Sequence, residues 1–154
     1  KEIGLTNAAG LVERLCDGPD LGDRLQADEL SGAVVLTSGG RAPSPPDLLD
    51  SARMAELVAA ARATYDLVVI DTPPVTAVSD PLIVARLADR CVYVVGWAVA
   101  KRRQVDDGVK RLREARAPIA GTVLSMVDVK RHAQYGYRDS GYYYRGYGDY
   151  YTEA

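Results

Sequence analysis

The sequence predicts an α/β fold, a doubly wound parallel sheet with helices packed on both faces. Four short apolar runs rich in β-branched residues recur at 33–37, 67–70, 91–95 and 119–124. Each run is continuously apolar, a pattern typical of strands buried on both faces. Segments with helical periodicity separate the runs, and alternation of strands and helices favours a parallel sheet with crossover helices.

Each expected helix between the strands has its own signal. Apolar positions that recur every three or four residues across 48–62 indicate one helical face. The Asp-Pro pair at 80–81 is typical of an N-cap followed by proline in the first turn, and predicts a helix that ends near 88. A third apolar stripe predicts a helix around 105–112. Ahead of the first strand we expect a short helix over 5–15.

The composition fits one folded domain followed by a tail. The chain has 154 residues, of which 47% are hydrophobic and 26% charged, within the usual range for a globular domain. We expect a folded domain over 1–129 and a flexible tail over 130–154, because the tail beyond residue 134 has no Leu, Ile, Val or Met to bury. The net charge of −2 argues against a nucleic-acid partner. No apolar run approaches the roughly 18 residues of a membrane-spanning helix.

The most informative segment is VVIDTPP at 68–74. A doubly wound sheet places its ligands at the carboxyl ends of the strands, where Asp71 follows an apolar run. A Walker B aspartate at this place helps to hold the magnesium ion bound to a nucleotide, and one carboxylate suffices, often acting through water. Three apolar residues and an aspartate alone more often mark a turn. The adjacent Pro-Pro pair and the later Asp80 favour the magnesium interpretation.

Four segments, in this order, resemble the bacterial tyrosine kinases (BY-kinases), the autokinases of capsular and exopolysaccharide synthesis. GLTN at 4–7 resembles the family's entry to a helix. PSPPDLL at 43–49, followed by SARM at 51–54, is similar to the family segment P-N-P-x-E-L-L-x-S-x-R-M. VIDTPPV at 69–75, followed by VSD, resembles the Walker B segment with its downstream aspartate. The tyrosine-rich end resembles the family's autophosphorylated cluster.

The resemblance implies a P-loop-NTPase-like domain that uses ATP and Mg²⁺ to phosphorylate its own tyrosines and so regulates polysaccharide polymerisation and export. It implies that Asp71 helps to hold magnesium, with Thr72 and Pro73 beside the nucleotide. It further implies that Asp80 assists the metal or orients the tyrosine hydroxyl.

The chain departs from the family in lacking a Walker A loop and the second, A′, motif. No Gly-Lys pair occurs anywhere in the sequence, so no such loop can cradle the phosphates. We therefore expect the C-terminal part of a catalytic domain, without its first strands and inactive alone, in a chain processed or truncated from a longer one. Ser44 and Ser125 stand where the family usually has asparagine, and Gly96-Trp97 replaces a usual arginine.

The tail combines clustered tyrosines with flexible glycines. Such a tail can place a hydroxyl in line with the γ-phosphate in a neighbouring subunit's site. Each phosphate adds about −1.5 to −2 charge, so repeated modification can release the tail by repulsion. A sticky aromatic segment, or one that stacks on single-stranded RNA, is the alternative; the acidic domain upstream favours phosphorylation. The expected acceptors are Tyr135, Tyr137, Tyr142, Tyr143, Tyr144, Tyr147, Tyr150 and Tyr151.

The resemblance also implies partners and a location. The implied partners are a second copy of the chain, a membrane-bound polysaccharide co-polymerase segment and a tyrosine phosphatase. The implied location is the cytoplasm, at the inner face of the plasma membrane. Two other functions stay open. One is a deviant Walker ATPase of the plasmid-partition or septum-positioning kind, which lacks such a tail. The other is a non-catalytic interaction module phosphorylated in trans, which the missing Walker A loop supports.

Overall fold

The computed structural model describes residues 4–17, 24–128 and 131. The tail tyrosines lie outside the described residues. In chain order the elements are α1 (Leu11–Asp17), β1 (Gln26–Ala27), β2 (Val34–Val35), α2 (Pro45–Leu49), α3 (Ala52–Thr64), α4 (Asp80–Val84), β3 (Cys91–Gly96), α5 (Arg102–Glu114) and β4 (Ile119–Ser125).

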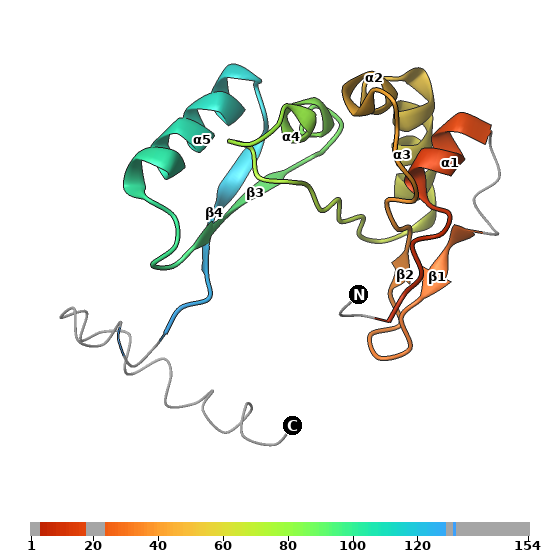
Figure 1. Cartoon of the computed structure of the whole chain (residues 1–154), viewed down its shortest axis with the longest axis horizontal. Coiled ribbons are helices and arrows are strands. Elements are labelled where there is room, and N and C mark those ends of the chain that lie inside the picture. Colours follow the sequence, from red (N-terminus) through yellow and green to blue (C-terminus); the bar gives the residue numbers. More distant parts are fainter. Residues whose placement is uncertain (1–3, 18–23, 129–130, 132–154) are drawn as a thin grey trace.

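The elements form two groups joined by an extended segment (Figure 1). One group contains α1, α2, α3 and the β1–β2 pair, and the other contains α4, α5, β3 and β4. Each group has its own buried cluster. Leu15, Met54, Leu57 and Val58 form the first, and the second is formed by Val75, Ala85 and Leu112.

The expected parallel crossover is confirmed in the second group. β3 and β4 pair in parallel, with Val94 opposite Val123, and α5 connects them. The apolar stripe of α5 packs inward through Leu112, which is 6% exposed, while its charged residues remain in solvent. The prediction that the strands are buried on both faces is wrong for the described structure. Val92 and Val94 are 57% and 60% exposed, because only one face of this pair carries a helix.

The expected strand at 67–70 is not formed. This segment is extended and its side chains alternate in exposure: Leu67 and Val69 are 78% and 79% exposed, whereas Ile70 packs on the first cluster. No strand of the described chain pairs with it. A strand needs a neighbour for its backbone N–H and C=O groups, and an apolar run alone does not supply one.

The run at 33–37 also differs from its prediction. Only Val34–Val35 is a strand, and it pairs antiparallel with β1 instead of joining a parallel sheet. The turn between them is closed by Asp28, whose carboxylate accepts hydrogen bonds from the backbone and hydroxyl of Ser31.

The predicted helix boundaries shift where side chains or distant carbonyls cap the backbone. The single helix expected over 48–62 is two helices, because Ser51 caps α3 by accepting a hydrogen bond from Met54 N at 3.2 Å. The first helix begins at Leu11, because the N–H groups of residues 11 and 12 donate to the carbonyls of residues 37 and 38. The prediction that Asp80 is an N-cap and that its helix ends near 88 is wrong: Ser79 is the N-cap and α4 ends at Val84, after which only turns continue to residue 88.

Candidate functional site

The link that carries the Walker B-like aspartate runs between the two buried clusters. Ile70 packs on the first cluster and Val75 belongs to the second. The intervening residues Asp71, Thr72, Pro73 and Pro74 are all exposed. The extended segment that joins the two groups in Figure 1 contains this link. Anchors on both sides thus hold an exposed carboxylate where the two groups meet.

Asp80 lies at the other end of the same loop. It is the first residue of α4 and is half-buried. A turn closed by the hydrogen bond from Ala77 N to Pro74 O, 2.9 Å long, shapes the chain between the two aspartates. The structure therefore places both predicted carboxylates on one loop, on opposite sides of its anchor Val75.

Both carboxylates are free to bind a cation. Within the described residues, neither Asp71 nor Asp80 forms a side-chain hydrogen bond or an ion pair, whereas Asp50 and Asp89 are each paired with an arginine. Carboxylate oxygens are the ligands that Mg²⁺ prefers, and the ion usually adds waters and substrate phosphates to one or two of them. The donor set therefore fits magnesium on a phosphate-bearing ligand. Among the described residues no group of three or more His, Cys, Asp or Glu side chains forms a self-sufficient metal cage.

The helix-entry segment has a bracing role that sequence reasoning missed. The Glu13 carboxylate accepts hydrogen bonds from Gly10 N at 2.7 Å and from Gly40 N at 2.8 Å. The backbone hydrogen bonds, that of Gly10 first, lower the pKa of Glu13 below its ordinary value. Asn7 adds a second brace, because its side chain accepts from Gly39 N and donates to Gly39 O, both at 2.9 Å. The signal was present in the sequence as Gly10 followed three residues later by Glu13, a capping-box spacing.

Arg53 is assigned a structural contact. Its Nη1 donates to the carbonyls of Leu15 and Cys16, both at 2.8 Å, at the C-terminal end of α1. A guanidinium at this end satisfies carbonyls that have no partner within the helix and complements the helix dipole. The resemblance had pointed to this position without giving its role.

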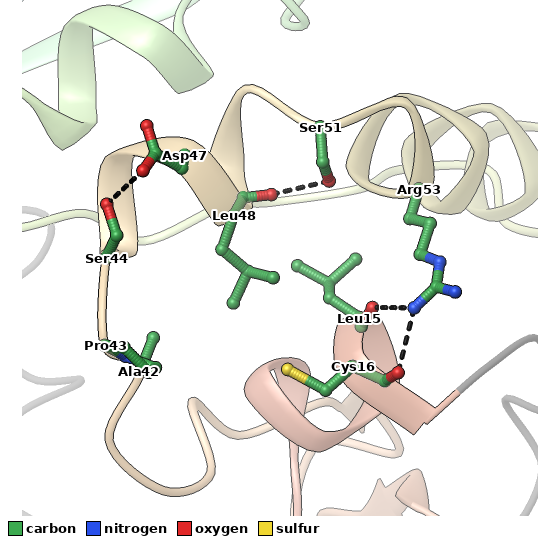
Figure 2. Close-up of a pocket in the computed structure, with 9 residues that line it drawn as sticks. All are labelled: Leu15, Cys16, Ala42, Pro43, Ser44, Asp47, Leu48, Ser51 and Arg53. Carbon is green, nitrogen blue, oxygen red and sulfur yellow. Dashed lines mark hydrogen bonds between the residues drawn. The ribbon is translucent and has the colours of Figure 1, made fainter.

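A pocket of about 470 Å³ lies between the end of α1, the loop at 42–44 and the start of α3 (Figure 2). Leu15 and Leu48 form its apolar wall, and Arg53 lies at its rim. Ser44, the residue that replaces the family's asparagine, donates its hydroxyl to Asp47 at 2.5 Å. The pocket contains none of the predicted magnesium or nucleotide residues, so it is separate from the Asp71–Asp80 loop.

The remaining predictions concern the tail tyrosines, the boundary between domain and tail, and a membrane-spanning helix. The eight tail tyrosines and the boundary at 129–130 lie outside the described residues. Among the described helices, none combines the length and apolar character needed to cross a bilayer.

Curated relatives of the chain are tyrosine-protein kinases. YwqD of Bacillus subtilis (strain 168) is 33% identical over 133 residues, which is 86% of this chain and 56% of that protein. The tyrosine-protein kinase wzc of Salmonella typhimurium is 33% identical over 92% of this chain and 19% of its own length. The chain thus spans about half, or less, of the curated relatives it matches. No protein-family model matches it.

Solved kinase domains share the fold. The kinase domain of Escherichia coli ETK superposes with a TM-score of 0.74 and 31% identity, covering 82% of this chain and 51% of that domain. The VpsO kinase domain gives a TM-score of 0.76 with 32% identity, covering 82% and 63%. The motifs, the parallel β3–α5–β4 unit and these similarities agree: the homologues of the chain are bacterial tyrosine kinases, and the chain shares the P-loop-NTPase-like α/β fold of their kinase domains.

Proposed function

We propose that the chain is part of an ATP-dependent protein-tyrosine autokinase that regulates the polymerisation and export of a capsular or extracellular polysaccharide. The observation that carries this proposal is the exposed, unpaired Asp71 on its anchored loop in a chain whose relatives are tyrosine-protein kinases. A phosphoryl-transfer enzyme acts mainly by positioning its groups and by neutralising charge on the phosphates, and this loop offers carboxylates for that purpose.

The proposed roles follow from the positions of the residues. Asp71 holds Mg²⁺, directly or through water, and the exposed Thr72 and Pro73 border the nucleotide. Asp80 assists the ion or accepts a hydrogen bond from the attacking tyrosine hydroxyl. Bound Mg²⁺ neutralises charge that develops on the phosphates. A Walker A loop in the complete domain holds those phosphates, because this sequence has no Gly-Lys pair with which to build one.

The tail and the partners complete the proposal. The eight tyrosines at 135–151 are the acceptors and enter the site of a neighbouring subunit. Accumulated phosphate releases the tail, and a tyrosine phosphatase resets it. The kinase works at the inner face of the plasma membrane through a fused or separate membrane-bound co-polymerase segment.

The test is autophosphorylation of the complete kinase with Asp71→Asn. We expect autophosphorylation to be slower by about 100-fold or more, because the variant loses the preorganised electrostatic contact that the Asp71 carboxylate makes in the transition state. Asp66→Asn is the matched control, since Asp66 is an exposed aspartate on the same segment without a proposed role. Equal activity of the two variants would refute the proposed function.

A second candidate function is a non-catalytic module phosphorylated in trans, which the absence of a Gly-Lys pair favours. The 154-residue chain is mixed with a complete kinase carrying isotopically labelled tyrosine, and phosphotyrosine is mapped by mass spectrometry. Both hypotheses predict phosphate on this chain, because each places its tail in another subunit's site. They differ in the effect of Asp71→Asn, which leaves phosphorylation unchanged if the chain is a module and slows autophosphorylation of the complete kinase if the chain is part of the enzyme. On either hypothesis the 154 residues alone bind Mg-ATP weakly, and tight binding contradicts both.

A further inference from the structure

The loop that carries Asp71 and Asp80 has one buried residue, Val75, between the packed residues at its two ends, Ile70 and Pro81. Among residues 71–79, all of which the structure describes, only Val75 is buried, at 6% exposure. Val75 lies four residues after Asp71 and five before Asp80. Val75 therefore fixes the middle of the loop, and its position affects the path of the chain from there to each carboxylate.

A helical glycine lies against this anchor. Gly108 is buried in the interior of α5, a position where glycine is less favourable than alanine. A Cβ added to Gly108 would lie 3.1 Å from Val75 Cγ1, tighter than ordinary van der Waals contact. α5 can approach the anchor this closely because residue 108 has no side chain.

Tyr93 of β3 fills the remaining space. The same added Cβ would lie 2.8 Å from Tyr93 Cζ and would overlap Tyr93 Oη. Tyr93 packs against the cluster that contains Val75, and burial raises the pKa of its hydroxyl. The phenol ring, the bare backbone of α5 and Val75 therefore meet at one point beneath the loop.

We propose that Tyr93 and Gly108 are positioning residues for phosphoryl transfer, because their close contact sets the position of Val75 and, through it, of Asp71 and Asp80. This inference rests on the proposed function. Neither residue touches nucleotide or metal. A displacement of about 1 Å at a reacting centre can slow an enzyme about 100-fold, so a contact that does not touch the reacting groups can still affect the rate.

The test uses the complete kinase with Gly108→Ala. We expect kcat/KM for Mg-ATP to fall about 10- to 100-fold and the Mg²⁺ concentration for half-maximal rate to rise, because the new methyl group displaces Val75. Gly121→Ala is the matched control, since a Cβ at Gly121 in β4 meets no atom within 4 Å. In the Tyr93→Leu background, Gly108→Ala is expected to lower activity much less than it does in the wild type, because leucine lacks the two tyrosine atoms that lie nearest to the new methyl group.

Three results overturn the inference while leaving the proposed function intact. The first is that Gly108→Ala and Gly121→Ala show the same Mg²⁺ dependence of the rate. The second is that Tyr93→Leu does not relieve the defect of Gly108→Ala. The third applies if Gly108→Ala does not fold, and is that Tyr93→Phe leaves the Mg²⁺ dependence unchanged. Failure of the proposed function is recognised separately, by full activity of Asp71→Asn.

Discussion

At the scale of single residues, backbone contacts explain the bracing of the helix-entry segment. Glu13 and Asn7 hold the chain before α1 against the glycines at 39–40. Those glycines lead directly into the loop that begins α2. The family-like segments at 4–7 and 43–49 are therefore tied together through a backbone loop, although neither contacts Asp71.

Replacement of Glu13 with glutamine is expected to reduce the pH dependence of stability. The folded-state pKa of Glu13 is lowered, so its stabilising effect is fully present above the ordinary pKa of 4.5 and is lost as pH falls through the lower folded value. Thermal unfolding of the complete domain, followed from neutral pH to below 4.5, measures this effect. Glu29→Gln is the control, since Glu29 is exposed; identical pH profiles for the two variants would contradict the assignment.

Replacement of Gly10 with alanine is expected to destabilise the fold by about 1–3 kcal/mol, as overpacking does. The added Cβ would lie 2.6 Å from Gly39 N and 2.7 Å from Thr37 C, both backbone atoms that cannot rotate away. Chemical denaturation measures the change, with Gly121→Ala as the uncrowded control. A Gly10→Ala variant as stable as that control would show that the two loops can separate at no cost.

At the scale of elements, the sequence correctly predicted the helices and strands whose stabilising contacts lie within a short stretch of the chain. It failed where the structure of a segment depends on a partner distant in sequence. α5 was predictable because its apolar stripe and its charged face lie within one segment. The β3–β4 pair was predictable because both strands and the crossover are present. The run at 67–70 has the same composition but no neighbouring strand in the described chain. The break at Ser51 could have been found from its capping hydroxyl, whereas the start of α1 depends on carbonyls about 26 residues away in sequence.

The same distinction applies to the candidate site. Asp71 and Asp80 could be named as candidates from the sequence because their signal is a short contiguous pattern, and their roles stay predictions. Val75, Tyr93 and Gly108 were not, since their contact joins a loop, a strand and a helix. Packing among three separate elements is set by the tertiary structure, so it produces no motif or periodic pattern that could be recognised in the sequence.

The contact between α2 and α4 is expected to depend weakly on charge. Arg86 of the turn after α4 forms an ion pair with Asp50 at 2.9 Å, and both side chains are more than half exposed. A double-mutant cycle with alanine at both positions should give a coupling energy of about 0.2–1 kcal/mol that disappears in 1 M salt. A coupling that persists in high salt would indicate a packing contact instead.

At the scale of the whole molecule, the β3–β4 pair has an open face, and the segment at 67–70 has no partner strand among the described residues. The chain spans about half of the relatives it matches. Val92 and Val94 are more than half exposed, and so are Leu67 and Val69. Exposed apolar patches of this kind normally mark a contact surface. We therefore predict that other parts of the complete kinase domain cover this face.

The 154-residue chain is therefore expected to bind a hydrophobic dye such as ANS more strongly than the complete kinase domain does. Val92→Thr/Val94→Thr should lower dye fluorescence of the 154-residue chain, because threonine keeps the shape of valine and adds a hydroxyl to the open face. Leu30→Gln is the control, since Leu30 is 98% exposed but lies on the turn between β1 and β2, away from that face. In the complete domain the paired valine substitutions should lower stability, because they then bury two hydroxyl groups against apolar neighbours. Unchanged stability there would show that this face stays in solvent in the whole kinase.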